Sequence, residues 1–388
     1  MANGMDFNFD VCPERSGTDS TKWARYAGRD VLPAWVADMD FASTPVIVDA
    51  LKQRLEHHVF GYATAHQSTH EAVIAYLARE RQWQVEPEWI VFTPALVPCL
   101  HGVIRAETPA GGAVITTTPV YPPFLSAPVL SGRTAECVPM VFDAGRWTFD
   151  FDALDAAAKR SQAKVFLLCN PHNPLGRVFT REELEKIAEF SARHGLVVCS
   201  DEIHCDLVLD PDAHHISYAT LGKEVAHNSV SLFAASKTYN TAGLLCGYAV
   251  IPDKALRARF RRALAGVANE VNIFGLVALE AAYRHGAPWQ RACVEYLRGN
   301  LDLVLTEIAR TPGVTIAQCP QATYLAWLDA RALGVENPAA VFEAGGVGLN
   351  NGADFGTPGF VRLNFGCPRE RLREILRRIR ATAEATKR

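Results

Sequence analysis

The chain has 388 residues, of which 49% are hydrophobic and 21% charged, and its net charge is -3 at pH 7. This composition excludes a disordered chain, and the length predicts two or three domains whose core needs no disulfide or metal for stability. The sequence has no domain-wide basic excess that would indicate nucleic-acid binding, and no polybasic stretch or ~18-residue apolar run that would indicate a membrane protein.

The N-terminus and the cysteines indicate a cytoplasmic protein. The first ten residues, MANGMDFNFD, are polar and acidic, which is not typical of a signal peptide. The ten cysteines are scattered without a Cys-x-x-Cys motif, so we expect reduced thiols. No metal is expected, because the pairs His57-His58 and His214-His215 lack a supporting cluster of acids or cysteines.

The middle of the chain alternates short apolar runs with helical patterns. The runs are nearly continuous in apolar residues, as expected of strands that are buried on both faces. In the helix between two of them, Thr180 and Glu183 form a capping box and Gly195 ends the helix. The pattern predicts an α/β domain with a largely parallel sheet and a right-handed βαβ unit. The expected strands are Val114–Thr117, Val165–Cys169, Leu196–Ser200, Val230–Ala235 and Tyr248–Ile251.

The C-terminal part has a different pattern. Long helical patterns cover Pro288–Arg310 and Arg369–Thr386, and between them Thr323–Leu328 and Val361–Phe365 are typical of strands. We expect a smaller α+β domain here. The predicted division is a large α/β domain at 50–285 and a small domain made of 1–49 and 286–388.

Reactive side chains follow the predicted parallel strands, where ligands bind beyond the carboxyl ends of an open sheet. Lys237 is one of only nine lysines and follows an apolar strand; partial desolvation there would lower its pKa and favour a neutral amine that can attack an aldehyde. An aldehyde cofactor with a pyridine ring also needs an acid, a phosphate cup and an aromatic lid, which Asp201, the backbone at 93–97 with Ser236, and Tyr121 can supply. Each residue alone is more typical of a surface lysine, a cap or a turn, but their coincidence on consecutive strand ends favours one site.

Seven stretches carry a family pattern. They are 32–41 (LPAWVADMDF), 59–62 (VFGY), 119–124 (PVYPPF), 170–177 (NPHNPLGR), 200–204 (SDEIH), 236–244 (SKTYNTAGL) and 360–369 (FVRLNFGCPR). With them, nearly the whole sequence resembles the fold-type I pyridoxal-phosphate enzymes of the class I and II aminotransferase superfamily. Within that superfamily it is most similar to the MalY/PatB group of cystathionine β-lyases and related carbon–sulfur lyases.

The resemblance implies roles in cofactor binding and catalysis. Lys237 matches the Schiff-base lysine, and Asp201 matches the acid that keeps the pyridine nitrogen protonated. Asn173 matches the residue that binds the phenolic oxygen, and Tyr121 the aromatic residue stacked on the ring; both also border the substrate. His204 stands where many aminotransferases carry a tyrosine and the lyase group carries a histidine.

The resemblance also implies substrate contacts and a dimer. Arg362 matches the arginine that binds the substrate α-carboxylate, for which a bidentate fork is suited. The stretch that contains Asp38 is placed near the substrate entrance. Tyr62 matches a tyrosine that reaches the phosphate in the neighbouring subunit, which implies a homodimer with shared active sites.

The phosphate cup departs from the family pattern. The segment Thr93-Pro94-Ala95-Leu96-Val97-Pro98-Cys99 replaces the usual Gly-Val-Val, and alanine at its third position has less freedom than glycine at positive φ. Leu245 stands where many aminotransferases have a phosphate-binding arginine, which the lyase group also lacks. Phosphate binding is therefore expected from Ser236 and from the backbone amides of Ala95, Leu96 and Val97.

Three functions remain open on the sequence. The favoured one is β-elimination of L-cystathionine or a related S-substituted cysteine to a thiol, pyruvate and ammonia. Transamination uses the same residues, although no motif marks the second arginine that a dicarboxylate substrate would need. A regulator-binding role, reported for some proteins of the lyase group, is the third.

Overall fold

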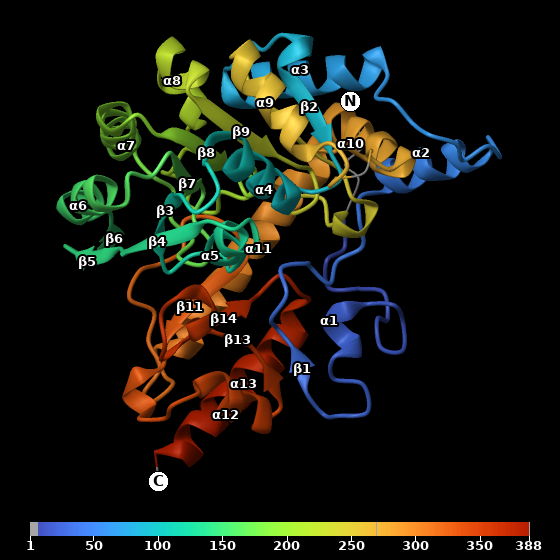
Figure 1. Cartoon of the computed structure of the whole chain (residues 1–388). Helices are drawn as coiled ribbons and strands as arrows, with labels where there is room; N and C mark the ends of the chain where they lie inside the picture. The colour runs from blue at the N-terminus through green and yellow to red at the C-terminus, as the bar shows by residue number, and fades with distance from the viewer. Residues whose placement is uncertain (1–6, 269, 388) are drawn as a thin grey trace.

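The structure is a computed structural model that describes residues 7–268 and 270–387. Most of the N-terminal stretch that argues against a signal peptide, residues 1–6, lies outside the described residues. Figure 1 shows an upper part built around one large sheet and a lower part that contains the C-terminal strands and helices. Within residues 7–268 and 270–387, no helix is both long and apolar enough to cross a bilayer.

A seven-stranded sheet forms the centre of the upper part. In spatial order its strands are β2 (Ile90–Thr93), β10 (Gly247–Val250), β9 (Ser229–Phe233), β8 (Val197–Asp201), β7 (Val165–Cys169), β3 (Ala113–Thr118) and β4 (Thr134–Pro139). The last five are mutually parallel, whereas β10 is antiparallel to both β2 and β9. The five predicted strands are confirmed within two residues. β2 and β4 were missed, since both are edge strands with partly exposed side chains.

Two helical layers cover the sheet, because alternate side chains of each buried strand point to opposite faces. In β7, Val165 and Leu167 pack against one apolar cluster, and Phe166 and Leu168 against another. The first cluster contains side chains of α4 (Leu96–Glu107), α5 (Pro123–Leu130) and α9 (Lys254–Leu264). The second contains α6 (Phe151–Ser161) and α7 (Arg181–His194) and is bordered by α8 (Lys223–His227). A third cluster joins β9 and β10 to α3 (Gln67–Arg81) and α10 (Ile273–His285).

Local signals place α7 between β7 and β8 as predicted. The Glu183 backbone N–H donates to the Thr180 hydroxyl (3.3 Å), and the Thr180 N–H donates to the Glu183 carboxylate (2.8 Å). Gly195 ends the helix at φ 61°, which glycine adopts without strain. The capping box and the βαβ unit are therefore confirmed.

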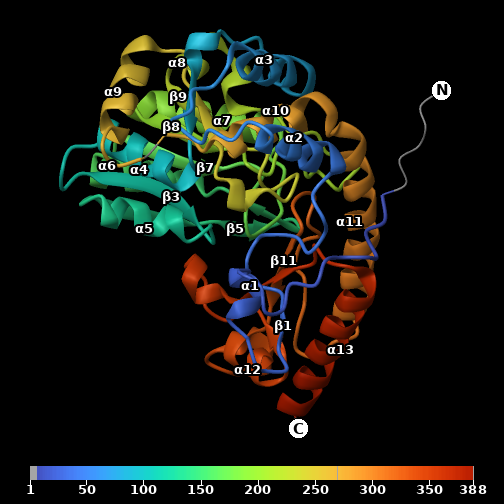
Figure 2. The ribbon, with the colours of Figure 1, turned by 90° about the vertical axis from the view of Figure 1, so that its right-hand side faces the viewer.

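The lower part combines both ends of the chain. A three-stranded sheet has the order β11 (Leu325–Asp329), β14 (Phe360–Asn364) and β13 (Asn350–Asn351), and β1 (Leu32–Pro33) pairs in parallel with β12 (Val347–Gly348). In Figure 2, α11 (Ala287–Ile308) runs from the upper part along the edge of the molecule to α13 (Arg369–Thr386). The predicted C-terminal helices and strands are confirmed, and the exact domain boundaries stay a prediction.

The remaining elements are short or peripheral. They are α1 (Thr21–Ala24), α2 (Pro45–Leu55), α12 (Pro338–Ala344), the hairpin β5 (Val141–Asp143) and β6 (Arg146–Thr148), and the 3-10 turns η1 (Pro87–Trp89), η2 (Tyr218–Leu221), η3 (Ala242–Leu244), η4 (Arg331–Leu333) and η5 (Gly352–Phe355).

Candidate active site

A cavity of about 370 Å³ lies at the carboxyl ends of the parallel strands, bordered by the segments that follow β3, β7, β8 and β9. It also reaches β14 and the N-terminal stretch around Ala37. The cavity brings together ten of the twelve predicted site residues: Ala95, Leu96, Val97, Tyr121, Asn173, Asp201, His204, Ser236, Lys237 and Arg362.

Lys237 follows β9, and its side chain enters the cavity. Its Nζ donates a hydrogen bond to the carbonyl oxygen of Ala37 (2.7 Å). Burial and the nearby Arg362 lower the pKa of Lys237 to about 8, against the opposing effect of Asp38 and Asp201. A substantial fraction of the amine is therefore neutral near physiological pH, as the sequence predicts.

Asp201 is the last residue of β8 and is buried. Burial raises the pKa of its carboxyl to about 6, although the Ile203 backbone N–H, 3.1 Å from Oδ1, and the charge of Lys237 favour ionisation. A cationic group in the cavity would stabilise the carboxylate further. His204, three residues on, is kept neutral because burial lowers its pKa to about 3, and its Nδ1 has no partner among the described residues.

Arg362 lies on β14 with its guanidinium buried. Nη1 donates to Asn173 Oδ1 (3.0 Å), and Nη2 donates to the Trp35 carbonyl (2.8 Å) and to Asn350 Oδ1 (2.7 Å). The guanidinium carbon lies 4.9 Å from the centre of the Phe355 ring. Burial lowers the pKa of Arg362 to about 10, so it remains a cation at neutral pH.

Three of these neighbours were not predicted as site residues. Trp35 lies inside the stretch 32–41, but it acts through its backbone carbonyl, which carries no sequence signal. Asn350 and Phe355 lie in a segment without a motif. Asn350 reaches the cavity because β13 pairs with β14 at Arg362, and Phe355 follows in η5.

The predicted phosphate cup is the N-terminus of α4. Ala95 is its N-cap residue at φ −162°, an extended conformation open to any residue, so the expected cost of replacing glycine there was wrong. The first backbone N–H groups of a helix lack partners within it, and together with the helix dipole they favour an anion. Ala95, Leu96, Val97 and Ser236 all line the cavity, as does Leu245.

Tyr121 and Asn173 link the segments that follow β3 and β7. The Tyr121 backbone N–H donates to the Asn173 carbonyl (3.0 Å), and both side chains line the cavity. Burial raises the pKa of the Tyr121 phenol, so it stays neutral. Its ring provides a flat wall that a planar ligand can stack against.

Asp38 and Tyr62 do not line the cavity. The Asp38 carboxylate accepts a hydrogen bond from Arg15 Nη2 (2.6 Å) on the outer side of the N-terminal stretch. Tyr62 is fully exposed in the segment between α2 and α3. Their proposed contacts with substrate and with a neighbouring subunit stay predictions.

In the part of the chain that the structure describes, no three His, Cys, Asp or Glu side chains are grouped to hold a metal ion. Cys99 is fully buried beside Thr93, and burial raises the pKa of its thiol to about 12. Cys99 is therefore a packed, neutral thiol.

Comparisons with known proteins agree with this geometry. The family described as aminotransferase class I and II matches residues 36–379. The chain is 39% identical to cystathionine beta-lyase PatB of Bacillus subtilis (strain 168), over 96% of this chain and 99% of that protein. The crystal structure of OvoB is similar with a TM-score of 0.94 and 44% identity, over 97% of this chain and 99% of that one. The crystal structure of cystalysin from Treponema denticola, which contains pyridoxal 5'-phosphate, is similar with a TM-score of 0.93 and 29% identity. The match covers 98% of this chain and 100% of that one.

Proposed function

Because the chain belongs to the class I and II aminotransferase family and, within it, to the MalY/PatB group of cystathionine β-lyases, we propose that it is a pyridoxal 5'-phosphate-dependent carbon–sulfur β-lyase. Its reaction converts L-cystathionine or a related S-substituted cysteine, with water, to a thiol, pyruvate and ammonia. The cavity that holds Lys237, Asp201 and Arg362 at the carboxyl edge of the sheet supports the cofactor chemistry, and the 39% identity to cystathionine beta-lyase PatB carries the choice of β-elimination over transamination.

The residues of the cavity fit the cofactor. The N-terminus of α4 and Ser236 offer donors for its phosphate, and Tyr121 offers a stacking surface for its ring. Asp201 is a buried acid that a ring nitrogen cation would stabilise, and Asn173 offers an amide for the phenolic oxygen. Lys237 would be the covalent attachment point of the cofactor, and the cofactor would supply a ring that withdraws electrons from the Cα of a substrate bound in place of the lysine.

The chain's own residues then bind the substrate and transfer protons. We propose that Arg362 binds the α-carboxylate; its contacts with Asn173, Asn350 and Trp35 fix the direction of the fork. Lys237 is neutral in large part near pH 8, so its amine can remove the proton from Cα. Asp201 holds the proton on the ring nitrogen.

The proposal predicts a specific product ratio. The purified chain is incubated with L-cystathionine and no keto-acid acceptor. We expect it to release pyruvate, ammonia and free thiol in equal amounts, and three parallel assays measure these products. The matched control is the same incubation with an added α-keto acid, which leaves a lyase rate unchanged. If neither cystathionine nor a panel of S-substituted cysteines yields thiol, and a new amino acid forms only with the keto acid, the chain is an aminotransferase.

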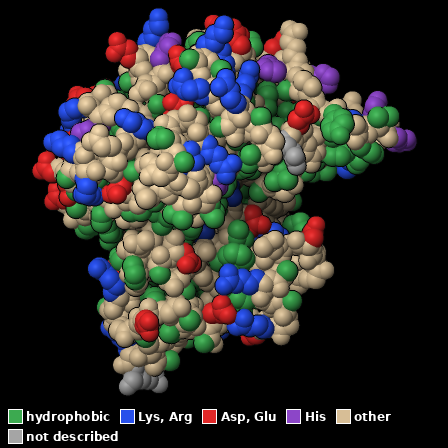
Figure 3. Space-filling model, in the orientation of Figure 1, with side chains coloured by type: hydrophobic (Ala, Val, Ile, Leu, Met, Phe, Trp, Pro, Cys, Tyr) green, Lys and Arg blue, Asp and Glu red, His purple; other side chains and the backbone are tan. Residues whose placement is uncertain are grey.

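We also propose a homodimer with shared active sites. The segment between α2 and α3 projects from the body in Figure 1, and Figure 3 shows hydrophobic side chains gathered on this projection. Leu55, Val59, Phe60 and Tyr62 are all exposed there. Apolar surface of this kind supports a subunit contact, in which Tyr62 would reach the phosphate in the neighbouring cavity.

Subunit mixing tests the shared site. Lys237→Ala and Tyr62→Ala homodimers are each expected to have little activity, since every site lacks one residue. A hybrid has one site with both residues native, so refolding the two together is expected to restore up to about half of the parent rate per hybrid. Lack of recovery in hybrids isolated with two affinity tags would contradict a shared site.

The cytoplasm is the proposed location. All ten cysteines are free of disulfides in the structure, and most are buried. Free buried thiols are typical of a reducing compartment.

A further inference from the structure

We propose that Tyr324 is a positioning residue that acts on Lys237 through the backbone carbonyl of Ala37. Two donors meet on that one oxygen: Lys237 Nζ at 2.7 Å and the Tyr324 hydroxyl at 2.9 Å. A carbonyl oxygen has two lone pairs, so both are occupied. Tyr324 is fully buried just before β11, and burial raises the pKa of its phenol, so the hydroxyl stays a donor at any working pH.

The backbone turns sharply at Ala37, which aims this carbonyl at Lys237. The Asp38 N–H donates to the Val36 carbonyl (3.0 Å), closing a three-residue turn with Ala37 at its centre. The Asn364 side-chain amide donates to the carbonyls on either side, those of Val36 (2.6 Å) and Asp38 (2.8 Å). Asn364, which lies on β14 two residues after Arg362, therefore holds the turn against this strand. It does not bond to the Ala37 carbonyl, which stays available to Lys237.

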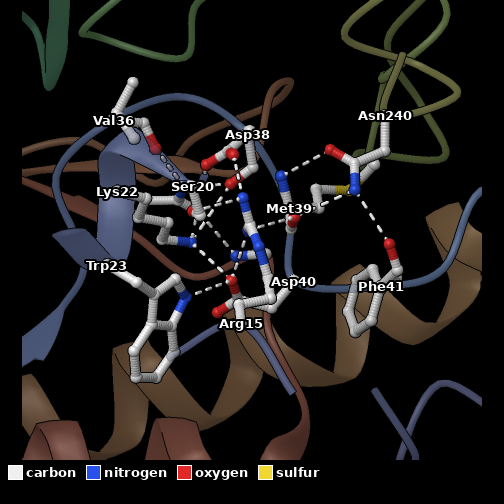
Figure 4. A network of polar contacts seen from close by, with 12 residues as sticks. Arg15, Ser20, Lys22, Trp23, Val36, Asp38, Met39, Asp40, Phe41 and Asn240 are labelled. Atoms are coloured by element: carbon white, nitrogen blue, oxygen red, sulfur yellow. Dashed lines mark hydrogen bonds and ion pairs between the residues drawn. The ribbon is translucent and has the colours of Figure 1, made fainter. Parts of the chain in front are cut away.

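The other end of the turn is tied to the loop that carries Lys237. Figure 4 shows Asn240 facing the stretch 39–41. Its Oδ1 accepts from the Met39 N–H (2.9 Å), and its Nδ2 donates to the carbonyls of Met39 (2.9 Å) and Phe41 (2.8 Å). Because Asn240 lies three residues after Lys237, the lysine and its acceptor move as one unit.

Ion pairs fix the outer side of the stretch. Arg15 Nη2 lies 2.6 Å from the Asp38 carboxylate, and Arg15 Nη1 lies 2.8 Å from that of Asp40. The Asp40 carboxylate also faces Lys22 at 3.2 Å (Figure 4). It lies 3.0 Å from Arg371 as well. Lys22 also lies 3.9 Å from the Asp38 carboxylate. These five cation contacts on two carboxylates leave the stretch little freedom to shift, which keeps the Ala37 carbonyl in place.

The consequence for chemistry rests on the proposed function. Once the substrate has displaced Lys237 from the cofactor, the amine must point its lone pair at the Cα proton. A hydrogen bond from one of its N–H groups to the Ala37 carbonyl restricts the rotation of the amine. The Tyr324 hydroxyl draws electron density from the same oxygen, so the carbonyl binds an ammonium less well. Tyr324 thereby favours the neutral amine. The charged or titratable groups that also act on Lys237 are Asp38, Asp201, His204 and Arg362.

The test measures the lysine directly in the full chain freed of cofactor. Acetic anhydride labels neutral amines, and the fraction of Lys237 labelled at each pH is read by mass spectrometry of its peptide. Tyr324→Phe is expected to raise the midpoint pH by roughly half a unit, since it removes one donor from the shared oxygen. The matched control is Tyr248→Phe, which removes an equally buried hydroxyl that contacts Tyr283 (3.1 Å) and does not line the cavity. Equal midpoints for the parent and Tyr324→Phe, or an equal shift in the control, would overturn the proposal.

Kinetics of the holoenzyme provide a second measurement. Tyr324→Phe is expected to lower kcat roughly three- to tenfold with KM unchanged, and to move the acid limb of the kcat profile to higher pH. Should this variant not fold, Asn364→Ser removes the amide that holds the turn and is expected to lower kcat in the same way. Unchanged kcat in the variant that folds would refute the assignment. If no S-substituted cysteine yields thiol, the proposed function fails, while the labelling midpoint still tests the role of Tyr324.

Discussion

Replacing Lys237 by alanine is expected to abolish turnover and the visible absorption of bound cofactor. Two proposed roles are lost at once, because Lys237 is the proposed attachment point of the cofactor and the proposed base that removes the Cα proton. General-base catalysis alone contributes about 10²–10⁴-fold, and loss of the attachment point adds to this. The measurements are pyruvate release from an S-substituted cysteine and the absorption spectrum of the dialysed protein.

Lys254 offers a matched control for this variant. It is an exposed lysine at the first position of α9 and lies outside the cavity. Lys254→Ala is expected to keep the parent rate and spectrum. If Lys237→Ala turned over substrate at a rate close to the parent, another of the nine lysines would have to bind the cofactor and the site would be misassigned.

Much of the site could be predicted because parallel strands end at one edge. The apolar runs of β3, β7, β8 and β9 are strong signals, and in a parallel sheet the residues that follow them must converge. The sequence alone therefore predicts that Tyr121, Asn173, Asp201 and Lys237 lie together, and all four line the cavity. The capping box of α7 fixed the crossover between β7 and β8 for a similarly local reason.

The rest of the site depends on contacts that no local pattern carries. The partners of Lys237 and Arg362 include the backbone carbonyls of Ala37 and Trp35, which every residue possesses. Asn350 reaches Arg362 only through the pairing of β13 with β14, and Tyr324 reaches Ala37 because the stretch around Ala37 packs beside the start of β11 and the end of β14. The reduced freedom expected of alanine at positive φ does not apply to Ala95, because this residue begins α4 in an extended conformation with φ −162°.

Replacing Asp201 by asparagine is expected to lower activity by at least about 100-fold while it stabilises the cofactor-free chain. The folded carboxyl has a pKa of about 6, above the ordinary value of 3.8. Between these two values the folded chain binds the proton more tightly than the unfolded chain does. The free energy of unfolding therefore falls as pH rises through this window, in total by about 3 kcal/mol, and remains lower above pH 6.

Asparagine has the same shape and keeps an oxygen for the Ile203 N–H, but it carries no charge to desolvate. Urea unfolding of cofactor-free protein is expected to give similar stabilities for parent and variant near pH 4, and a more stable variant near pH 7. The control variant is Asp302→Asn, at an exposed position of α11. It should have the same activity as the parent and the same free energy of unfolding as the parent at both pH values. Equal stability of Asp201→Asn and parent at pH 7 would mean that the carboxylate is not desolvated in the empty cavity. If the variant is instead more stable and less active, the Asp201 carboxylate lowers the stability of the cofactor-free chain. The positive charge of the cofactor's ring nitrogen would then compensate for this loss of stability.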